Sequence, residues 1–189
     1  MAAHPGARPD VQPARPAPGS VPEQGAVLVH LVRHGDAVSR RVWDGPELLR
    51  PLTGAGEDQA RALAARLCPR PGGASPPVRV VSSPASRCLG TVRPTAVAAG
   101  LTLDELDELG EGSDPLAALG VLVALADALG AGQTIVACTH GDVVYGILDA
   151  LAGSDVALDG PRTVPKASTW DLEVVHAAVR AARFVAPPA

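Results

Sequence analysis

Two arginines and two histidines stand where apolar segments of this sequence end. The stretch "LVRHGD" places Arg33 and His34 after one apolar run, "SSPASR" places Arg87 after a second, and "CTHGD" places His140 after a third. Arginine binds phosphate oxygens through paired N–H groups, and a neutral imidazole can act as a nucleophile or carry a proton. These residue types together indicate chemistry on a phosphoryl group.

The three apolar runs have the composition of buried strands. Residues 26–32 ("AVLVHLV"), 78–83 ("VRVVSS") and 134–140 ("TIVACTH") are short and almost continuously apolar. Such runs are typical of parallel strands that are covered on both faces. Because ligands of these sheets bind at the carboxyl ends of the strands, we expect the four candidates to converge there. Arg87 and His140 also begin helices, whose free N–H groups favour an anion.

Helical segments alternate with these strands. We expect Thr53 to cap a helix whose apolar face includes Ala60 and Leu63, and Ser83 to cap a helix that begins at Pro84. Further helices are predicted over residues 115–129 and 141–153, and residues 168–175 and 179–185 have the pattern of a β-hairpin. This order predicts an α/β fold, a three-layer sandwich with a mostly parallel central sheet and helices on both faces.

Composition limits the class of protein. Residues 1–24 are rich in Pro, Ala, Gly and Arg without periodicity and are predicted to be a disordered tail, whereas residues 25–189 are predicted to form one domain. No apolar run approaches the roughly 20 residues that span a bilayer. Three separated cysteines and the lack of an apolar leader favour a cytoplasmic protein. A net charge of -4 predicts neither nucleic acid nor a membrane as partner, and the oligomeric state is left open.

The sequence argues against several other phosphate and metal chemistries. The only lysine, Lys166, follows no glycine-rich loop, so no nucleotide P-loop is present. A cysteine phosphatase has an arginine six positions after its cysteine, and none of the three cysteines has one. Cys138 and His140 are the only close pair of zinc-ligand types, whereas a zinc site needs paired Cys or His at close spacing from more than one such pair. We therefore expect no metal and no cofactor.

Histidine remains as the nucleophile. A neutral imidazole can attack phosphorus when its other ring nitrogen is held by a hydrogen bond and cations neutralise the equatorial oxygens of the phosphoryl group. We expect His34 to take the phosphoryl group and Gly35 to let backbone approach closely. The groups expected to bind the phosphate are Arg33, Arg87 and His140.

The same motifs resemble those of the histidine phosphatases, also called the phosphoglycerate mutase-like superfamily. The resemblance runs from about Val27 to Trp170 and rests on the order of four segments, "LVRHGD", "RPLTGAGEDQARALAARL", "VVSSPASRCLGT" and "CTHGD". It is nearest to the small capless branch that includes bacterial phosphohistidine phosphatases. It implies a phosphoglycerate mutase-like fold and a metal-independent phosphatase that forms a covalent phosphohistidine.

The resemblance also implies roles for single residues. It makes His34 the phosphorylated nucleophile, Arg33 and Arg87 phosphate ligands, and His140 both a ligand and a catalytic residue. The general acid that protonates the leaving group falls at Glu111, within "LGEG". Ser83 and Thr139 are implied to bind the phosphate or hold the histidines. Five other acidic residues stay open as alternatives for the acid: Asp104, Glu105, Asp107, Glu108 and Asp114.

The expected function is hydrolysis of a phosphomonoester or a phosphohistidine, carried by a phosphorylated small molecule or a phosphohistidine protein. A phosphoglycerate mutase-type phosphotransferase is one alternative. Residues 112–137 leave room for one crossover helix and no covering insertion, which favours a site open to water and hence hydrolysis. A non-catalytic phosphate-binding module is the alternative from another class.

Other residues are expected to have structural roles. Cys138 has the setting of a small buried hydrophobe, and Trp170 that of a core anchor. Arginines in loops are usually solvated, so Arg41 and Arg50 are weak candidates for substrate contact. Three histidines have no chemical context in the sequence: His4, His30 and His176.

Overall fold

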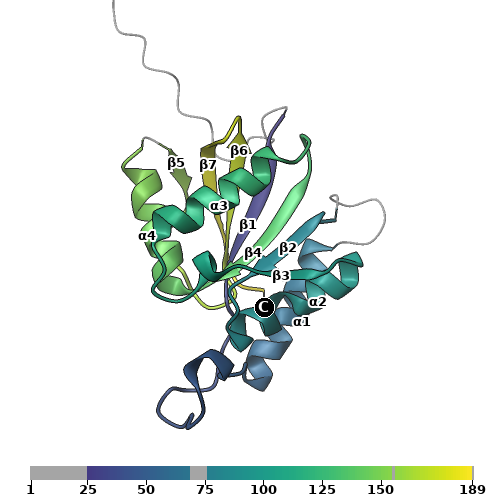
Figure 1. Cartoon of the computed structure of the whole chain (residues 1–189), viewed down its shortest axis with the longest axis vertical. Coiled ribbons are helices and arrows are strands. Elements are labelled where there is room, and N and C mark those ends of the chain that lie inside the picture. The colour runs from purple at the N-terminus through teal and green to yellow at the C-terminus, as the bar shows by residue number, and fades with distance from the viewer. Residues whose placement is uncertain (1–24, 69–75, 155, 189) are drawn as a thin grey trace, which may run out of the picture.

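A twisted sheet forms the centre of the fold (Figure 1). The structure, a computed structural model, describes residues 25–68, 76–154 and 156–188, so the predicted tail over residues 1–24 lies outside the described residues. Within them the sheet has seven strands in the order β3-β2-β4-β1-β6-β7-β5. The strands are β1 (Val27–Arg33), β2 (Arg79–Ser82), β3 (Leu103–Glu105), β4 (Thr134–Thr139), β5 (Ala157–Asp159), β6 (Thr169–Val175) and β7 (Ala178–Val185).

Most neighbouring strands run parallel. β3, β2, β4 and β1 form one parallel block, and β5 pairs in parallel with β7. β6 pairs antiparallel with β1 and with β7, which forms the predicted hairpin. The mostly parallel sheet is therefore confirmed. The short strand β5 was not predicted, because its three residues carry no pattern of their own.

Four α-helices of the described residues cover the two faces of the sheet. They are α1 (Gly54–Leu67), α2 (Ser86–Ala99), α3 (Pro115–Asp127) and α4 (Gly141–Ala152), and two short 3₁₀ turns, η1 (Glu47–Leu49) and η2 (Asp107–Leu109), lie between strands and helices. α3 and α4 pack on one face, and α1 and α2 on the other (Figure 1). This arrangement confirms the predicted three-layer sandwich.

The alternation of side chains along β1 supplies both halves of the core. Val29 and Leu31 point into the cluster formed with α3 and α4, whereas Val32 points into the cluster with α1 and α2. Trp170 is fully buried in the first cluster and its Nε1 donates to Thr163 O at 3.1 Å, so its predicted core role is confirmed. Cys138 is a fully buried free thiol in the second cluster, as predicted.

One of the two predicted helix caps is present. Thr53 Oγ1 accepts from Gly56 N at 3.1 Å and begins α1, in which Ala60 and Leu63 are buried. The prediction that Ser83 caps a helix starting at Pro84 is wrong, because α2 begins two residues later with Ala85 at the N-cap. The Ser83 hydroxyl instead bonds the ring of a histidine on another strand end.

A projecting arm leaves the sheet at the carboxyl end of β1. Residues 37–52 form this arm, which a single antiparallel bridge between Ala37 and Leu52 closes at its base. It contains η1 and lies at the lower end of the molecule in Figure 1. The arm therefore forms a wall beside the end of the central strand.

The described helices are short. The longest, α1 and α2, have 14 residues each, and none of the helices that the structure describes combines the length and apolarity of a bilayer span.

Candidate active site

His34 is fixed at the end of β1 by its backbone and by its ring. Its backbone N donates to Thr139 O at 3.0 Å, and the next amide, Gly35 N, donates to Thr91 Oγ1 at 2.9 Å. Ring atom Nδ1 lies 2.8 Å from Gly35 O. A carbonyl can only accept, so Nδ1 carries the proton and Nε2 holds a free lone pair.

The surroundings of His34 keep the ring neutral. Its pKa is lowered from 6.5 to about 3. Burial is the largest cause, since the residue is only 6 % exposed, and the hydrogen bond to Gly35 opposes it. Neighbouring groups lower the pKa further: His140, Arg87 and Arg33.

Arg33 lies beside His34 with its guanidinium against the start of α4. Its Nη1 donates to Val164 O at 2.5 Å, while its buried Nε has no hydrogen-bond partner among the residues described. A Cβ added at Gly141 would lie 3.0 Å from that Nε. A glycine at the first position of α4 therefore leaves room for the guanidinium at this helix start.

Arg87 connects the second histidine to two acidic residues. Its Nη2 donates to Glu111 Oε2 at 2.9 Å and to His140 Nδ1 at 3.3 Å, and its Nη1 donates to Glu47 O at 3.0 Å. A guanidinium can only donate, so Nδ1 of His140 accepts and Nε2 donates to Ser83 Oγ at 2.9 Å. Both Arg87 and His140 are 1 % exposed.

Glu111 also comes to the site. Both of its carboxylate oxygens accept from Arg40 Nη2 at 2.6 Å, and its side chain is 38 % exposed. The alternative acids lie elsewhere in the described structure: Asp104 pairs with Arg79, Asp114 caps α3, and Asp107 and Glu108 belong to the exposed turn η2. Glu105, the remaining alternative, is an exposed residue of β3.

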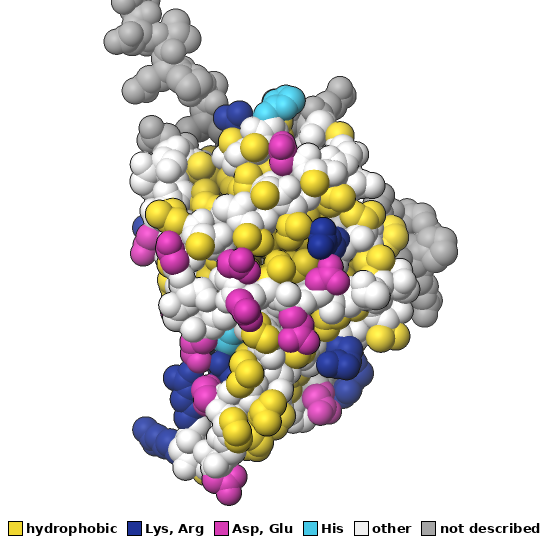
Figure 2. Space-filling model, in the orientation of Figure 1, with side chains coloured by type: hydrophobic (Ala, Val, Ile, Leu, Met, Phe, Trp, Pro, Cys, Tyr) yellow, Lys and Arg dark blue, Asp and Glu magenta, His cyan; other side chains and the backbone are white. Residues whose placement is uncertain are grey.

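A cavity of about 500 Å³ opens in front of His34. Its charged lining residues are Arg33, Asp36, Arg40, Arg50, Glu111 and Lys166. Figure 2 shows basic and acidic side chains gathered beside the arm at this end of the molecule. The cavity thus presents cations from the strand end, the arm and the loop before β6, in keeping with an anionic substrate.

The structure brings together the five residues predicted to bind the phosphate or carry the reaction. Arg33, His34, Arg87, Glu111 and His140 lie within one network of contacts at the carboxyl ends of β1 and β4. The rings of His34 and His140 lie 5.4 Å apart between centroids. The Thr139 hydroxyl, by contrast, donates to Leu109 O at 2.6 Å, away from the histidines.

The positions of the charged loop residues became clear only from the structure. Arg50, expected to be solvated, is 7 % exposed and donates to Glu47 and to Val38 O, whereas Arg41 is exposed and does not line the cavity. Arg40 and Lys166 line the cavity and were not predicted. The one available signal was that Lys166 is the only lysine of the chain.

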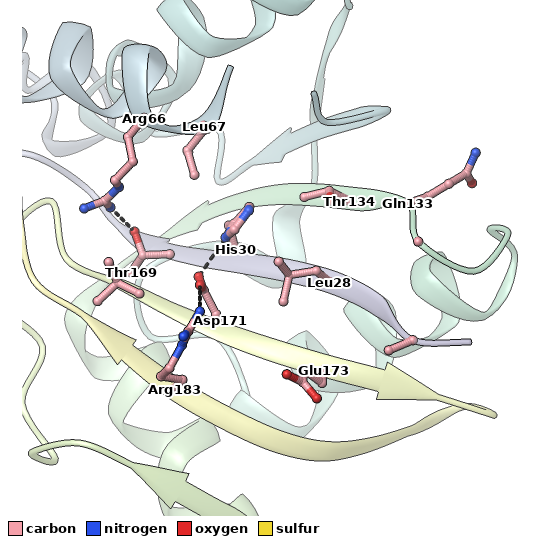
Figure 3. A pocket seen from close by; sticks show the side chains of 13 residues that line it. Leu28, His30, Arg66, Leu67, Gln133, Thr134, Thr169, Asp171, Glu173 and Arg183 are labelled. Carbon is pink, nitrogen blue, oxygen red and sulfur yellow. Dashed lines mark hydrogen bonds and ion pairs between the residues drawn. The ribbon is translucent and has the colours of Figure 1, made fainter. Parts of the chain in front are cut away.

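A second cavity, of about 430 Å³, lies on the sheet face near the start of β1 (Figure 3). His30 Nδ1 donates to Asp171 Oδ1 at 2.7 Å there, and Arg183 Nη2 lies 3.5 Å from Asp171 Oδ2. The prediction that His30 has no chemical context is therefore wrong. The cause is sheet register, because His30 and Asp171 face each other on β1 and β6.

Comparison with known families finds a match for part of the chain. The model of the family described as "Histidine phosphatase superfamily (branch 1)" matches residues 29–113, the segment that carries Arg33, His34, Arg87 and Glu111. Residues 29–113 thus have the sequence pattern of the histidine phosphatase superfamily. No sequence among the curated proteins matches the chain.

Solved structures show the same fold. The protein histidine phosphatase SixA complexed with tungstate aligns with a TM-score of 0.63 and 22 % identity over 86 % of this chain and 96 % of its own. A mycobacterial glucosyl-3-phosphoglycerate phosphatase aligns with a TM-score of 0.59 and 17 % identity over 87 % of this chain and 99 % of its own. Phosphoglycerate mutase from Bacillus anthracis aligns with a TM-score of 0.56 and 13 % identity over 88 % of this chain and 93 % of its own. These likenesses confirm the phosphoglycerate mutase-like fold.

Proposed function

We propose that this protein is a metal-independent histidine phosphatase that hydrolyses a phosphomonoester or a phosphohistidine. The observation that carries the proposal is the hydrogen bond from His34 Nδ1 to Gly35 O, in a ring that burial keeps neutral. Because Nδ1 holds the proton, the lone pair of Nε2 is available to attack phosphorus. Residues 25–189 would form the catalytic domain of a cytoplasmic enzyme, a location that the three free cysteines favour.

Three cationic or polar groups would bind the phosphoryl oxygens. Arg33 and Arg87 each have a buried Nε without a partner in the described part of the chain, which leaves donors for an anion. His140 Nδ1 lies beside Arg87 and would donate to a phosphoryl oxygen in the other tautomer of the ring, with Nε2 then accepting from the Ser83 hydroxyl. A phosphoryl oxygen would take the place that Glu111 holds on Arg87, and preorganised donors of this kind stabilise the charge of the transition state.

The reaction would proceed in two displacements. In the first, His34 Nε2 forms a bond to phosphorus, the bond to the leaving oxygen breaks, and that oxygen takes a proton from the Glu111 carboxyl group. In the second, water attacks the phosphohistidine, Glu111 takes a proton from the water, and inorganic phosphate leaves with the N–P bond broken. Glu111 is the acidic residue that lines the cavity on this side and touches Arg87.

Hydrolysis is favoured over transfer to a second substrate because the cavity is open. The side chains of Arg40 and Lys166 at its rim are 59 % and 41 % exposed, so water reaches the site. The names of similar structures include a protein histidine phosphatase and a glucosyl-3-phosphoglycerate phosphatase. The substrate would accordingly be a phosphohistidine protein or a phosphorylated small molecule.

The test is phosphate release from 4-nitrophenyl phosphate with EDTA present. We expect turnover by the wild-type protein and a loss of at least about 1000-fold in His34→Ala, because no other group replaces the nucleophile. His176→Asn is the matched control, since His176 is an exposed turn residue with φ 49°, a conformation that asparagine tolerates.

Equal turnover in wild type and His34→Ala would refute the proposed nucleophile. If the wild type releases no phosphate from this ester, a protein-bound phosphohistidine is the next substrate. Phosphate binding without release from either would identify a non-catalytic phosphate-binding module instead.

A further inference from the structure

Lys166 lies in the same cavity as His34 but has no part in the proposed reaction. It is the only lysine of the chain, and its side chain is 41 % exposed. Its ammonium group can therefore reach both the cavity and a bound molecule.

The loop that carries Lys166 is tied to the backbone of the site. The amide of Ala167 donates to Arg33 O at 3.1 Å and to His34 O at 3.2 Å, and Arg33 N donates to Ser168 O at 3.0 Å. Ala167 is fully buried and has a φ of 60°, in the left-handed region that favours glycine. Strained backbone of this kind persists where the surroundings fix it, and here it fixes the position of Lys166 beside the nucleophile.

The ammonium group retains donors for a ligand. Lys166 Nζ donates to Asp36 Oδ1, its one hydrogen-bond partner among the described residues. The other oxygen of Asp36 accepts from Thr53 Oγ1 at 2.7 Å, which holds this carboxylate against the start of α1. An ammonium group has three N–H donors, so Lys166 can keep Asp36 and bind a second acceptor.

Two other cations that line the cavity have more hydrogen-bond partners than Lys166 has. Arg40 binds both Glu47 and Glu111, and Arg50 binds Glu47 and Val38 O while being almost completely buried. Lys166 is thus the rim cation best able to meet a further anion.

We propose that Lys166 binds a second anionic group on the leaving group of the substrate. This inference rests on the proposed phosphatase function and narrows its substrate class to phosphate esters that carry a further carboxylate or phosphate. The phosphoryl group at His34 would be held by Arg33 and Arg87, and the second anion by Lys166 in the same cavity.

The experiment compares three esters of similar size. They are glycerol 3-phosphate, 3-phosphoglycerate, which adds a carboxylate, and propane-1,3-diol bisphosphate, which adds a phosphate. We expect the wild-type protein to show a KM about tenfold lower for at least one doubly anionic ester than for glycerol 3-phosphate, as a charge-assisted hydrogen bond would give. The ester that shows the preference identifies the second anion.

Substitutions at Lys166 test whether it causes the preference. Lys166→Met should abolish it by raising KM for the doubly anionic ester alone, and Lys166→Arg should retain it. The matched control is Arg61→Met, which removes an exposed cation of α1 outside the cavity and should leave all KM values unchanged. An unchanged preference in Lys166→Met, or no preference in the wild type, would overturn the inference.

A second measurement needs no turnover. Trinitrobenzenesulfonate modifies amines, and Lys166 supplies the only side-chain amine, so mass spectrometry of its peptide reports its accessibility. In His34→Ala, we expect a doubly anionic ester to protect Lys166 and glycerol 3-phosphate to leave it reactive. Equal protection would refute the anion site. If no ester is turned over by the wild type but selective protection is seen, the proposed hydrolysis of phosphate esters fails and the anion site stands.

Discussion

The neutral state of His34 makes a quantitative prediction about stability. In the unfolded chain this residue has its ordinary pKa of 6.5, whereas in the folded protein burial lowers the pKa to about 3. Between these values the unfolded state binds a proton that the folded state does not bind. The stability from His34 is therefore fully present above pH 6.5 and is lost as the pH falls toward 3.

The size of the effect follows from the two pKa values. Each pH unit below the pKa of the unfolded state lowers the free energy of unfolding by about 1.4 kcal/mol. The loss therefore reaches about 2 kcal/mol at pH 5 and tends toward about 5 kcal/mol near pH 3. Such a loss is a large fraction of the roughly 5–15 kcal/mol by which domains are stable. The lone pair that the proposed attack on phosphorus requires is thus maintained at a cost in acid stability.

The measurement is urea unfolding of wild type and His34→Gln at pH 7.5 and pH 5. Glutamine keeps a polar side chain of similar reach and does not titrate, so other titrating groups cancel when the two pH effects are subtracted. Between these pH values we expect the wild-type protein to lose about 2 kcal/mol more of its unfolding free energy than the variant loses. Equal losses would show that folded His34 titrates normally and would refute the argument for a neutral ring.

Two further predictions concern the groups around His34. Thr91 is fully buried, and its hydroxyl accepts from Gly35 N at 2.9 Å and donates to Arg87 O at 2.7 Å. Thr91→Val should lower the unfolding free energy by about 1–3 kcal/mol, measured by urea unfolding, because it leaves the buried amide of Gly35 unpaired. Thr95, whose hydroxyl is buried without a partner in the described structure, provides the control, since Thr95→Val should cost less. Glu111→Gln should reduce kcat for an alkyl phosphate by about 100-fold or more and change kcat for 4-nitrophenyl phosphate little, because nitrophenolate leaves without a proton. An equal reduction for both esters would show that Glu111 does not act as the acid.

The sequence predicts the parts of the site that follow directly from strand ends. Arg33, His34 and His140 each follow an apolar run, and parallel strands bring such positions to one edge whatever lies between them. The side-chain partners were harder to predict. Ser83 has the local signal of a helix cap, but its hydroxyl bonds His140 on the next strand end, a contact that depends on the packing of β2 against β4.

Contacts between distant loops could not be predicted. Lys166 meets Asp36 only because the loop before β6 returns to the end of β1, and Arg40 meets Glu111 only because the arm reaches the loop that follows η2. Neither segment has periodicity, so neither side chain has a predictable direction. His30 and Asp171 are paired by the antiparallel register of β1 and β6, and the sequence signals the strands without fixing their register.

The position of β1 has a consequence for motion. This strand is hydrogen bonded along its length to β4 on one side and β6 on the other, whereas the arm over residues 37–52 is closed by one bridge. Opening of β1 requires both ladders to break, so its amides exchange with solvent only in near-global unfolding, while the arm opens in a local event. Amide exchange would therefore divide the candidate site into a slow centre that holds His34 and a fast wall beside the cavity.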